Sequence, residues 1–324
     1  MCAEVARLGG DFEAAEIAAG PYGLGLRTRR AVEALEVVAS IPLSACAVAS
    51  AARDEDAVAR CASAFLESPN RAWRELVLEH TATRHLPLTW DEASFERRTR
   101  GLSIRSELRR RRETARAVAE RDARLLVAQA HVASRAYWLS SDDLVLAPVL
   151  DFANHDADAA YVDAGDGVFA RRDEVVLLAS RPVPPHAELF ATYLRDASRA
   201  DFFANFGFVD PTADRAPLRL AYRRKTLSLD VLLRDATLLD DADSQLALAD
   251  FVADLADKPL AATTRYFDAL LDDIPQNDDD EPDDIAAAIA ALRRDERRAL
   301  GVLREHVIAA RSPRDEGAAP PLTS

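Results

Sequence analysis

Two regions of short apolar segments are separated by a long region of helical spacing, and this order restricts the fold more than any other feature of the 324-residue chain. Residues 21–50 contain a glycine turn and a β-branched apolar stretch over 36–41, which together predict a hairpin. Residues 54–138 repeat apolar side chains at helical intervals. Residues 144–193 return to short apolar segments between Asp-Gly and Pro-rich turns. The sequence therefore predicts a mostly β core with a helical insertion.

The pattern changes again after Pro211. A few β-like residues over 218–229 come first. Amphipathic helical patterns then follow near 241–257, 259–271 and 283–310. We therefore place a domain boundary near Ala213. The acidic run over 278–281 is interpreted as a solvated loop, and the Pro- and Ala-rich residues 312–324 as a disordered tail.

The charge balance limits the kinds of partner that suit this surface. Lys and Arg total 41 against 55 Asp and Glu, a formal net charge of -14. Such a surface disfavours nucleic acid and anionic membranes and suits a basic protein surface. The basic run over 109–112 lies beside Glu107, Glu113 and Glu120, which can pair with it at helical spacing. No stretch reaches the roughly 20 apolar residues that a membrane span needs.

The cysteines and the N-terminal residues indicate where such a chain works. Cys2, Cys46 and Cys61 lack the spacing of disulfides or of a zinc cluster, which favours a reducing compartment. Residues 1–20 carry several acids and no long apolar run, so no secretory signal or transit peptide is visible. We expect an intracellular protein, cytoplasmic or nuclear, and a monomer.

Two short motifs suggest binding chemistry but are weak when taken alone. Gly23-Leu24-Gly25 lets the backbone approach a ligand, yet no third glycine opens a helix, so a dinucleotide site is not indicated. The segment from Asp151 to His155 ends in Asn-His, and an asparagine can donate and accept hydrogen bonds at a zwitterionic ligand. A metal site with Asp156 and Asp158 is the rival interpretation, but a second histidine ligand or a His-x-Glu arrangement is missing.

Four segments occur together in an order that is typical of one family. They are Tyr22-Gly23-Leu24-Gly25, Ser134-Arg135-Ala136-Tyr137, Pro148-Val149-Leu150-Asp151-Phe152-Ala153-Asn154-His155, and Glu188-Leu189-Phe190-Ala191-Thr192-Tyr193 followed by Asn205-Phe206-Gly207-Phe208-Val209. Together they resemble the SET-domain methyltransferases, in particular the group typified by the Rubisco large-subunit lysine methyltransferase.

The resemblance implies an α+β fold with two domains. A SET-domain β core would cover residues 20–211, with the helical insertion over about 52–138. An all-α substrate-binding domain would follow over 213–311. The implied activity is S-adenosyl-L-methionine-dependent methylation of a lysine side chain on another protein. Two alternatives stay open: a protein-histidine methyltransferase on the same scaffold, and a SET-like binding module without catalysis.

The resemblance also implies roles for individual residues. Tyr193 matches the catalytic tyrosine. Cofactor contacts are implied for Gly23, Leu24, Gly25, Arg135, Asn154, His155 and Phe208. Positions near the substrate-amine channel are implied for Ser134, Asp151 and Phe206. No metal ligand is implied.

Three residues depart from the family pattern. Tyr22 replaces a glutamate before Gly-Leu-Gly, which removes a charged partner for the cofactor's amino group. Asp156 replaces a serine and adds charge near the pocket. Phe206 replaces a tyrosine and removes a hydroxyl from the amine channel, which leaves room for an imidazole or for added methyl groups.

Overall fold

The computed structural model describes most of the chain as two compact units. The described residues are 1–21, 23–50, 56–120, 122–139, 143–156, 168–171, 173–179, 181–194, 197–222, 225–235, 237–239, 242–256, 258–275 and 284–310. The first unit comprises Met1–Phe95, Glu107–Ala197 and Asp201–Thr212, and the second comprises Glu96–Ser106, Ser198–Ala200 and Ala213–Ser324. Tyr22, the acidic run over 278–281 and the tail over 312–324 lie outside the described residues.

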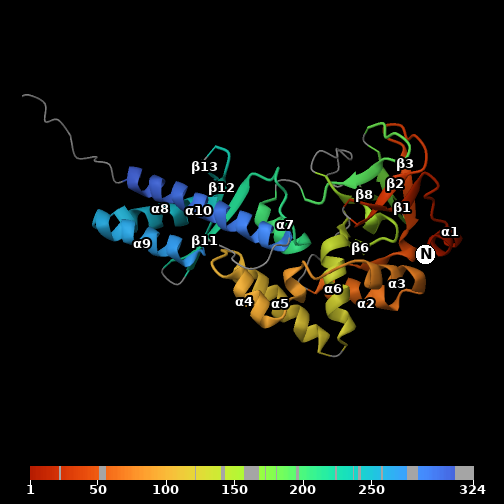
Figure 1. Ribbon diagram of the computed structural model, residues 1–324, viewed down its shortest axis with the longest axis horizontal. Coiled ribbons are helices and arrows are strands. Elements are labelled where there is room, and N and C mark those ends of the chain that lie inside the picture. The colour runs from red at the N-terminus through yellow and green to blue at the C-terminus, as the bar shows by residue number, and fades with distance from the viewer. Residues whose placement is uncertain are drawn as a thin grey trace, which may run out of the picture. The chain divides into compact units, whose positions relative to one another are not determined.

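Small sheets form the β core of the first unit (Figure 1). One has the order β1 (Ala15–Gly20), β2 (Gly23–Thr28), β10 (Glu188–Ala191), β7 (Asn154–His155). A second has the order β3 (Val37–Pro42), β9 (Glu174–Leu178), β8 (Val168–Arg171). A third has the order β4 (Ala47–Ala49), β6 (Leu144–Leu146), β5 (Tyr137–Trp138). The strands expected over 168–170, 175–178 and 189–191 are therefore confirmed.

The hairpin expected within residues 21–50 is wrong. β2 pairs with β1 on one side and with β10 on the other, while β3 pairs with β9 in a separate sheet. The hairpin lies earlier in the chain, because Gly20 and Gly23 face each other across a tight turn. The strand β1 carries Glu16 and several alanines and gives only a weak apolar signal. Sequence reasoning therefore missed the correct partner of β2.

Alternate side chains of these strands fill one apolar core. Leu26, Ile41, Val175, Leu177 and Leu189 belong to one buried cluster and are each 0% exposed. Burying such a side chain contributes about 1.5–3 kcal/mol. The strand order is therefore held mainly by this shared apolar face, with the backbone hydrogen bonds setting the register.

Helices precede and interrupt the β core, as the helical spacing predicted. A short helix α1 (Cys2–Arg7) begins the chain. The helices of the insertion are α2 (Ala57–Glu67), α3 (Arg71–His80), α4 (Glu92–Thr99), α5 (Arg105–Ala119) and α6 (Arg124–Arg135). Asn70 caps α3 by accepting a hydrogen bond from the backbone N–H of Trp73 at 3.2 Å. The Trp73 ring packs edge-on against Phe65, with 4.9 Å between centroids.

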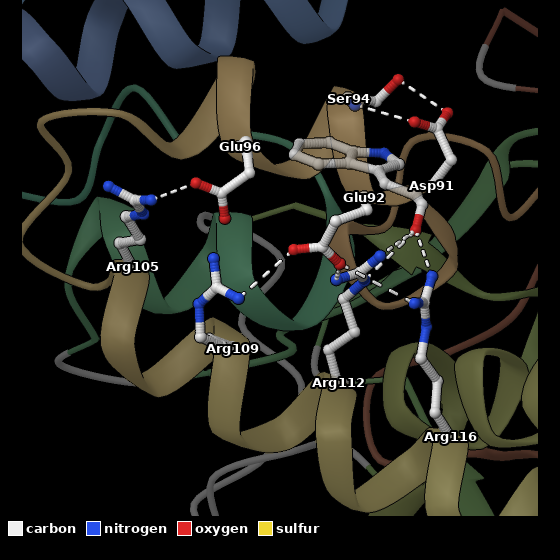
Figure 2. Close-up of polar contacts among 9 residues, drawn as sticks. Asp91, Glu92, Ser94, Glu96, Arg105, Arg109, Arg112 and Arg116 are labelled. Atoms are coloured by element: carbon white, nitrogen blue, oxygen red, sulfur yellow. Dashed lines mark hydrogen bonds and ion pairs between the residues drawn. The ribbon is translucent and has the colours of Figure 1, made fainter.

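The arginine run of α5 is used inside the first unit. Arg112 is buried, and its Nη2 donates to the carbonyl oxygen of Trp90 at 2.9 Å, as does Nη2 of Arg116 at 2.8 Å. Figure 2 shows the guanidinium groups of Arg109 and Arg112 directed at Glu92. The expected pairing of the run with Glu107 is confirmed, whereas Glu92, an acid far outside the helix, was not foreseen.

The second unit combines a sheet with helices. The sheet order is β11 (Arg215–Tyr222), β12 (Lys225–Leu232), β13 (Thr237–Leu239), all antiparallel. The helices α8 (Ala242–Ala256), α9 (Leu260–Asp273) and α10 (Asp284–Ala310) follow, close to the expected ranges. The C-terminal region is helical as predicted, but it is not all-α. Ala216, Leu218 and Leu220 are buried at every second position, the period of a half-buried strand.

No helix among the described residues is both long and apolar enough to cross a membrane.

A segment from the helical insertion belongs to the second unit. The backbone N–H of Ser103 donates to Oε1 of Glu296 in α10 at 2.7 Å. Glu296 is 5% exposed, and burial raises the pKa of its carboxyl to about 8. Gly101 turns this segment with φ +76°, and a Cβ there would lie 2.9 Å from the carbonyl oxygen of Asp273. The segment 96–106 is therefore fitted closely to the second unit.

The buried Glu296 predicts a pH-dependent stability. Its folded pKa of about 8 lies above the ordinary value of 4.5, so the folded state holds the proton more tightly than the unfolded state does. Stability contributed at this site falls as the pH rises from about 4.5 to about 8. Glu296→Gln keeps an acceptor for Ser103 and cannot ionise. We expect equal thermal unfolding of variant and wild type near pH 5 and a higher unfolding temperature for the variant at pH 8. A variant less stable throughout that range would show that Glu296 is ionised in the fold.

Candidate active site

A parallel pair of short strands brings the distant motifs together. Asn154 and His155 of β7 lie opposite Phe190 and Ala191 of β10. The other edge of β10 pairs with β2, where Glu188 lies opposite Arg27. The Gly-Leu-Gly, Asn-His and strand-Tyr segments thus meet in one sheet, although more than 160 residues separate the first from the last.

The glycine segment makes room for a side-chain pair. Gly23 adopts φ +95°, a conformation that favours glycine. A Cβ on Gly25 would lie 2.6 Å from Oε1 of Glu188 and 2.9 Å from Nδ2 of Asn154. These two atoms are themselves hydrogen-bonded, with Asn154 Nδ2 donating at 2.7 Å. Leu24, between the glycines, packs against a buried cluster. Gly25 therefore permits close approach of two polar side chains to the strand backbone.

His155 is held in one tautomer by its two partners. The backbone N–H of Tyr193 points to Nδ1 of His155 at 3.2 Å, so Nδ1 must accept. The proton then lies on Nε2, which is 3.1 Å from Oδ2 of Asp210. Burial alone would raise the pKa of Asp210, but hydrogen bonds from Thr212 and His155 hold it below its ordinary value. Asp210 is thus an ionised carboxylate that orients His155.

Aromatic rings surround Tyr193 and His155. The Tyr193 ring lies 5.1 Å from that of His155 and 4.7 Å from that of Phe206, between centroids. Phe208 lies 5.8 Å from His155. The helix α7 (Arg199–Phe206) supplies Phe206 and also the fully packed Phe202, a ring that sequence reasoning did not single out. The structure therefore brings together four residues that the sequence predicted for the site: Tyr193, His155, Phe206 and Phe208.

The Tyr193 hydroxyl is buried and oriented. It donates to the carbonyl oxygen of Ala153 at 2.8 Å. Burial raises the pKa of Tyr193 to about 12, so the phenol stays protonated at neutral pH. With its proton committed to Ala153, the oxygen keeps its acceptor capacity for a further group.

Tyr193 and Phe206 line a cavity of about 590 Å³ in the first unit. Most of the wall is apolar or aromatic, including Leu86 and Trp138. The charged side chains in the wall are Glu107, Arg110 and Arg111. Burial alone would raise the pKa of Glu107, but hydrogen bonds from both arginines lower it to about 2. The cavity therefore offers a largely apolar space with Tyr193 in its wall.

Three further residues predicted for the site do not line the cavity: Arg135, which contacts the backbone of Asp151, and Asp151 and Ser134 themselves. Arg135 donates to the backbone oxygen of Asp151 at 2.7 Å. The Asp151 carboxyl is buried and accepts from the indole N–H of Trp73 at 2.9 Å, and burial raises its pKa to about 7. The Ser134 hydroxyl donates back to Ala130 within α6 at 2.9 Å. Neither Asp151 nor Ser134 is among the residues that line the cavity.

Several contributors escaped sequence reasoning for identifiable reasons. Asp210 lies one residue beyond the last motif, and Trp73 lies in a helix with an ordinary apolar pattern. Glu188 was quoted within its motif without a role, and only the strand pairing reveals its contact with Asn154. The described residues contain no group of three or more His, Cys, Asp or Glu side chains able to hold an ion, and Asp158 of the rival metal interpretation lies outside them.

Comparisons with known proteins identify the fold. No protein-family model matches the sequence, and no curated protein sequence matches it significantly. The crystal structure of the SET domain of LSMT bound to lysine and AdoHcy aligns with a TM-score of 0.70 over 94% of this chain and 90% of that chain, at 15% identity. The same domain bound to MeLysine and AdoHcy gives 0.72 over 96% and 91%, at 14% identity.

The fold class is therefore that of a SET domain, as the sequence motifs predicted. Its particular form is that of Rubisco LSMT: the structure of that protein bound to AdoMet aligns with a TM-score of 0.66 over 92% of this chain and 88% of that chain, at 14% identity.

Gly207, between Phe206 and Phe208, provides a test of the packing around Tyr193. It adopts φ +76°, and a Cβ there would lie 2.6 Å from the backbone oxygen of His85. Gly207→Ala should lower the free energy of unfolding by about 1–3 kcal/mol, measured by urea denaturation. Gly301→Ala is the control, since nothing lies within 4 Å of a Cβ at that helical position. Equal stability of the two variants would contradict the strain at Gly207.

Proposed function

We propose that this protein is an S-adenosylmethionine-dependent protein-lysine N-methyltransferase in which Tyr193 acts at the transferred methyl group. The observation that carries the proposal is the Tyr193 hydroxyl, fixed by Ala153 at 2.8 Å beside a largely apolar cavity of about 590 Å³. Tyr193 also follows β10 by two residues, close to the point where β10 pairs with the Asn-His strand β7. Similar solved structures include ones bound to AdoHcy and to AdoMet.

The residues present fit the cofactor. Its methionyl end is a zwitterion, which calls for polar partners of both signs. Asn154 offers an amide beside Gly25, and Arg135 offers a guanidinium close to the backbone of the same motif. Its adenine is a flat aromatic ring system, which suits stacking on the rings of His155 and Phe208. These contacts support the assignment of Gly23, Leu24, Gly25, Arg135, Asn154, His155 and Phe208 to the cofactor.

When bound, the cofactor supplies a methyl group on a positively charged sulfur. The protein's task is to align a neutral amine with that methyl and to exclude water. Tyr193 can accept a weak CH···O contact because its own proton is directed to Ala153. Its pKa of about 12 keeps it protonated, so it does not take the amine proton at neutral pH. The amine therefore gives its proton to a group other than Tyr193 before transfer.

The acceptor is proposed to be lysine on another protein. A largely apolar space matches the four methylene groups of a lysine side chain, and Tyr193 and Phe206 lie in its wall. The second unit, with residues 213–311, is proposed to bind the substrate protein without taking part in the chemistry. The net charge of -14 favours a basic surface on that protein. We further propose a monomer that works in the cytoplasm or nucleus.

A labelling experiment tests this function. The purified protein is incubated with methyl-tritiated S-adenosylmethionine and a fractionated lysate, and labelled peptides are sequenced by mass spectrometry. We expect label on the ε-nitrogen of lysine. Label on an imidazole would replace lysine with histidine as acceptor, and cofactor binding without transfer to any fraction would identify a binding module.

Tyr193→Phe separates chemistry from binding. The variant loses only the hydroxyl, which contacts Ala153 and is proposed to contact the methyl group. Turnover should fall about tenfold or more, a loss of roughly 1.4 kcal/mol or more in transition-state stabilisation, while AdoHcy affinity stays within about twofold of wild type. Single-turnover kinetics and calorimetry measure the two quantities. Unchanged turnover in a folded variant would remove Tyr193 from the mechanism.

Phe206 is expected to influence how many methyl groups are added. Its ring packs at 4.7 Å from that of Tyr193 and offers no hydroxyl to restrain a partly methylated amine. We expect di- or trimethyl-lysine from the wild type and a shift toward monomethyl-lysine in Phe206→Tyr. Intact-mass analysis after long incubation decides this. A wild type that stops at one methyl, with no change in the variant, would contradict it.

A further inference from the structure

The arginines of α5 serve two different places in the first unit. Arg112 and Arg116 donate to the carbonyl oxygen of Trp90, as Figure 2 shows. Arg110 and Arg111 instead line the cavity of about 590 Å³. The helix therefore brings two positive charges to a wall that is otherwise largely apolar.

Glu107 holds both of these arginines but balances the charge of only one. Nε and Nη2 of Arg110 donate to its two carboxylate oxygens at 3.1 and 3.0 Å, and Nε of Arg111 donates to Oε1 at 2.7 Å. Burial alone would raise the pKa of Glu107, but the hydrogen bonds from the arginines lower it to about 2, so the carboxylate is ionised at neutral pH. Two positive charges and one negative charge leave an excess of one positive charge in the wall.

Arg111 is oriented from two sides and keeps donors for a ligand. Besides Glu107, it contacts Asn205 of α7, whose Oδ1 accepts from Nη1 at 2.9 Å. Asn205 is itself fixed, because its Nδ2 donates to the backbone oxygen of Asp201 at 2.8 Å. A guanidinium carries five N–H donors, and Nη2 of Arg111 donates to none of the described residues. The side chain is 41% exposed, so these N–H groups can be reached.

The cavity has room for more than one side chain of a substrate. The five non-hydrogen atoms of a lysine side chain fill roughly 150 Å³ at the ~30 Å³ that one water molecule occupies in the liquid. The cavity measures about 590 Å³, and Asn205 adjoins Phe206 in its wall. A residue close to the lysine can therefore enter together with it. A carboxylate matches the excess positive charge and accepts from a guanidinium in a favourable planar geometry.

We propose that Arg111, held in place by Glu107 and Asn205, binds the carboxylate of an aspartate or glutamate close to the target lysine of the substrate protein. The inference rests on the proposed function and adds a requirement for the residues around the acceptor. The net charge of -14 acts on the surface of the substrate protein as a whole. Arg111 acts locally, inside a wall of the opposite sign, and determines which lysines are methylated.

A double-mutant cycle across the two proteins tests this contact. The labelling experiment supplies a substrate protein, and each Asp or Glu within about four residues of its labelled lysine is replaced in turn by Asn or Gln. One replacement should lower kcat/KM with the wild-type enzyme about tenfold, equivalent to roughly 1.4 kcal/mol. With Arg111→Gln the same replacement should change kcat/KM less than about twofold, because its partner is already absent. Arg111→Glu should favour a substrate that carries lysine in place of the acid.

Arg71→Gln is the matched control. Arg71 pairs with Glu75 at 2.5 Å and at the same spacing along a helix as Arg111 and Glu107, but it does not line the cavity. This variant removes the same charge and should respond to the substrate replacements as the wild type does. Calorimetry should give an AdoHcy affinity within about twofold of wild type for every variant, a quantity that general damage to the fold would lower.

The possible outcomes separate the contact from the proposed function. Arg111→Lys keeps the charge without the planar group, and a smaller effect of the substrate replacement in this variant decides the question if Arg111→Gln does not fold. A labelled lysine without a nearby acid would overturn the contact, as would a replacement that has the same effect with wild type and with the Arg111 variants. AdoHcy binding without methyl transfer to any lysate protein would instead overturn the proposed function.

Discussion

The parallel pairing of β7 with β10 is the contact on which the candidate site depends. Each strand is too short to be stable by itself, since β7 contains only Asn154 and His155. Its position is secured because the adjacent β10 also pairs with β2, and Leu26 and Leu189 are buried in the shared core. The apolar core therefore determines where two polar residues lie. Asn154 then meets Glu188, and His155 meets the backbone of Tyr193, without any contact between the motifs in sequence.

Hydrogen bonds then determine which atoms of His155 and Tyr193 carry a proton and where these protons point. Tyr193 contributes a backbone N–H to Nδ1 of His155 and a hydroxyl proton to Ala153. Both contacts fix which atom carries a proton, one by setting the histidine tautomer and the other by directing the phenol. Asp210 accepts the hydrogen bond from Nε2 of His155. A site that must align groups and exclude water needs such fixed protons more than it needs an acid or base poised near pH 7.

The sequence predicted local structure better than it predicted partners. Short apolar segments between turns located β9 and β10, and helical spacing located the helices of the second unit. The same patterns do not show which strands pair or which charged side chains meet. β1 has a weak apolar pattern yet is the partner of β2, and the ion pairs between Glu92 and the arginines of α5 join residues about 20 positions apart. Gly25 shows the same limit: its small size suggested a ligand, while its nearest neighbours are Glu188 and Asn154.

The segment 96–106 has a consequence for how such a protein can be divided. The backbone leaves the first unit after Phe95, Ala197 and Thr212, so neither unit is a single continuous piece of chain. A C-terminal fragment that begins at Ala213 would lack Ser103, the donor to buried Glu296. The carboxyl group of Glu296 would then lose this hydrogen bond. Moving the second unit into another protein therefore requires moving the internal segment 96–106 together with the C-terminal region. A single cut in the chain leaves part of one unit attached to the other, so one cut cannot separate the two units.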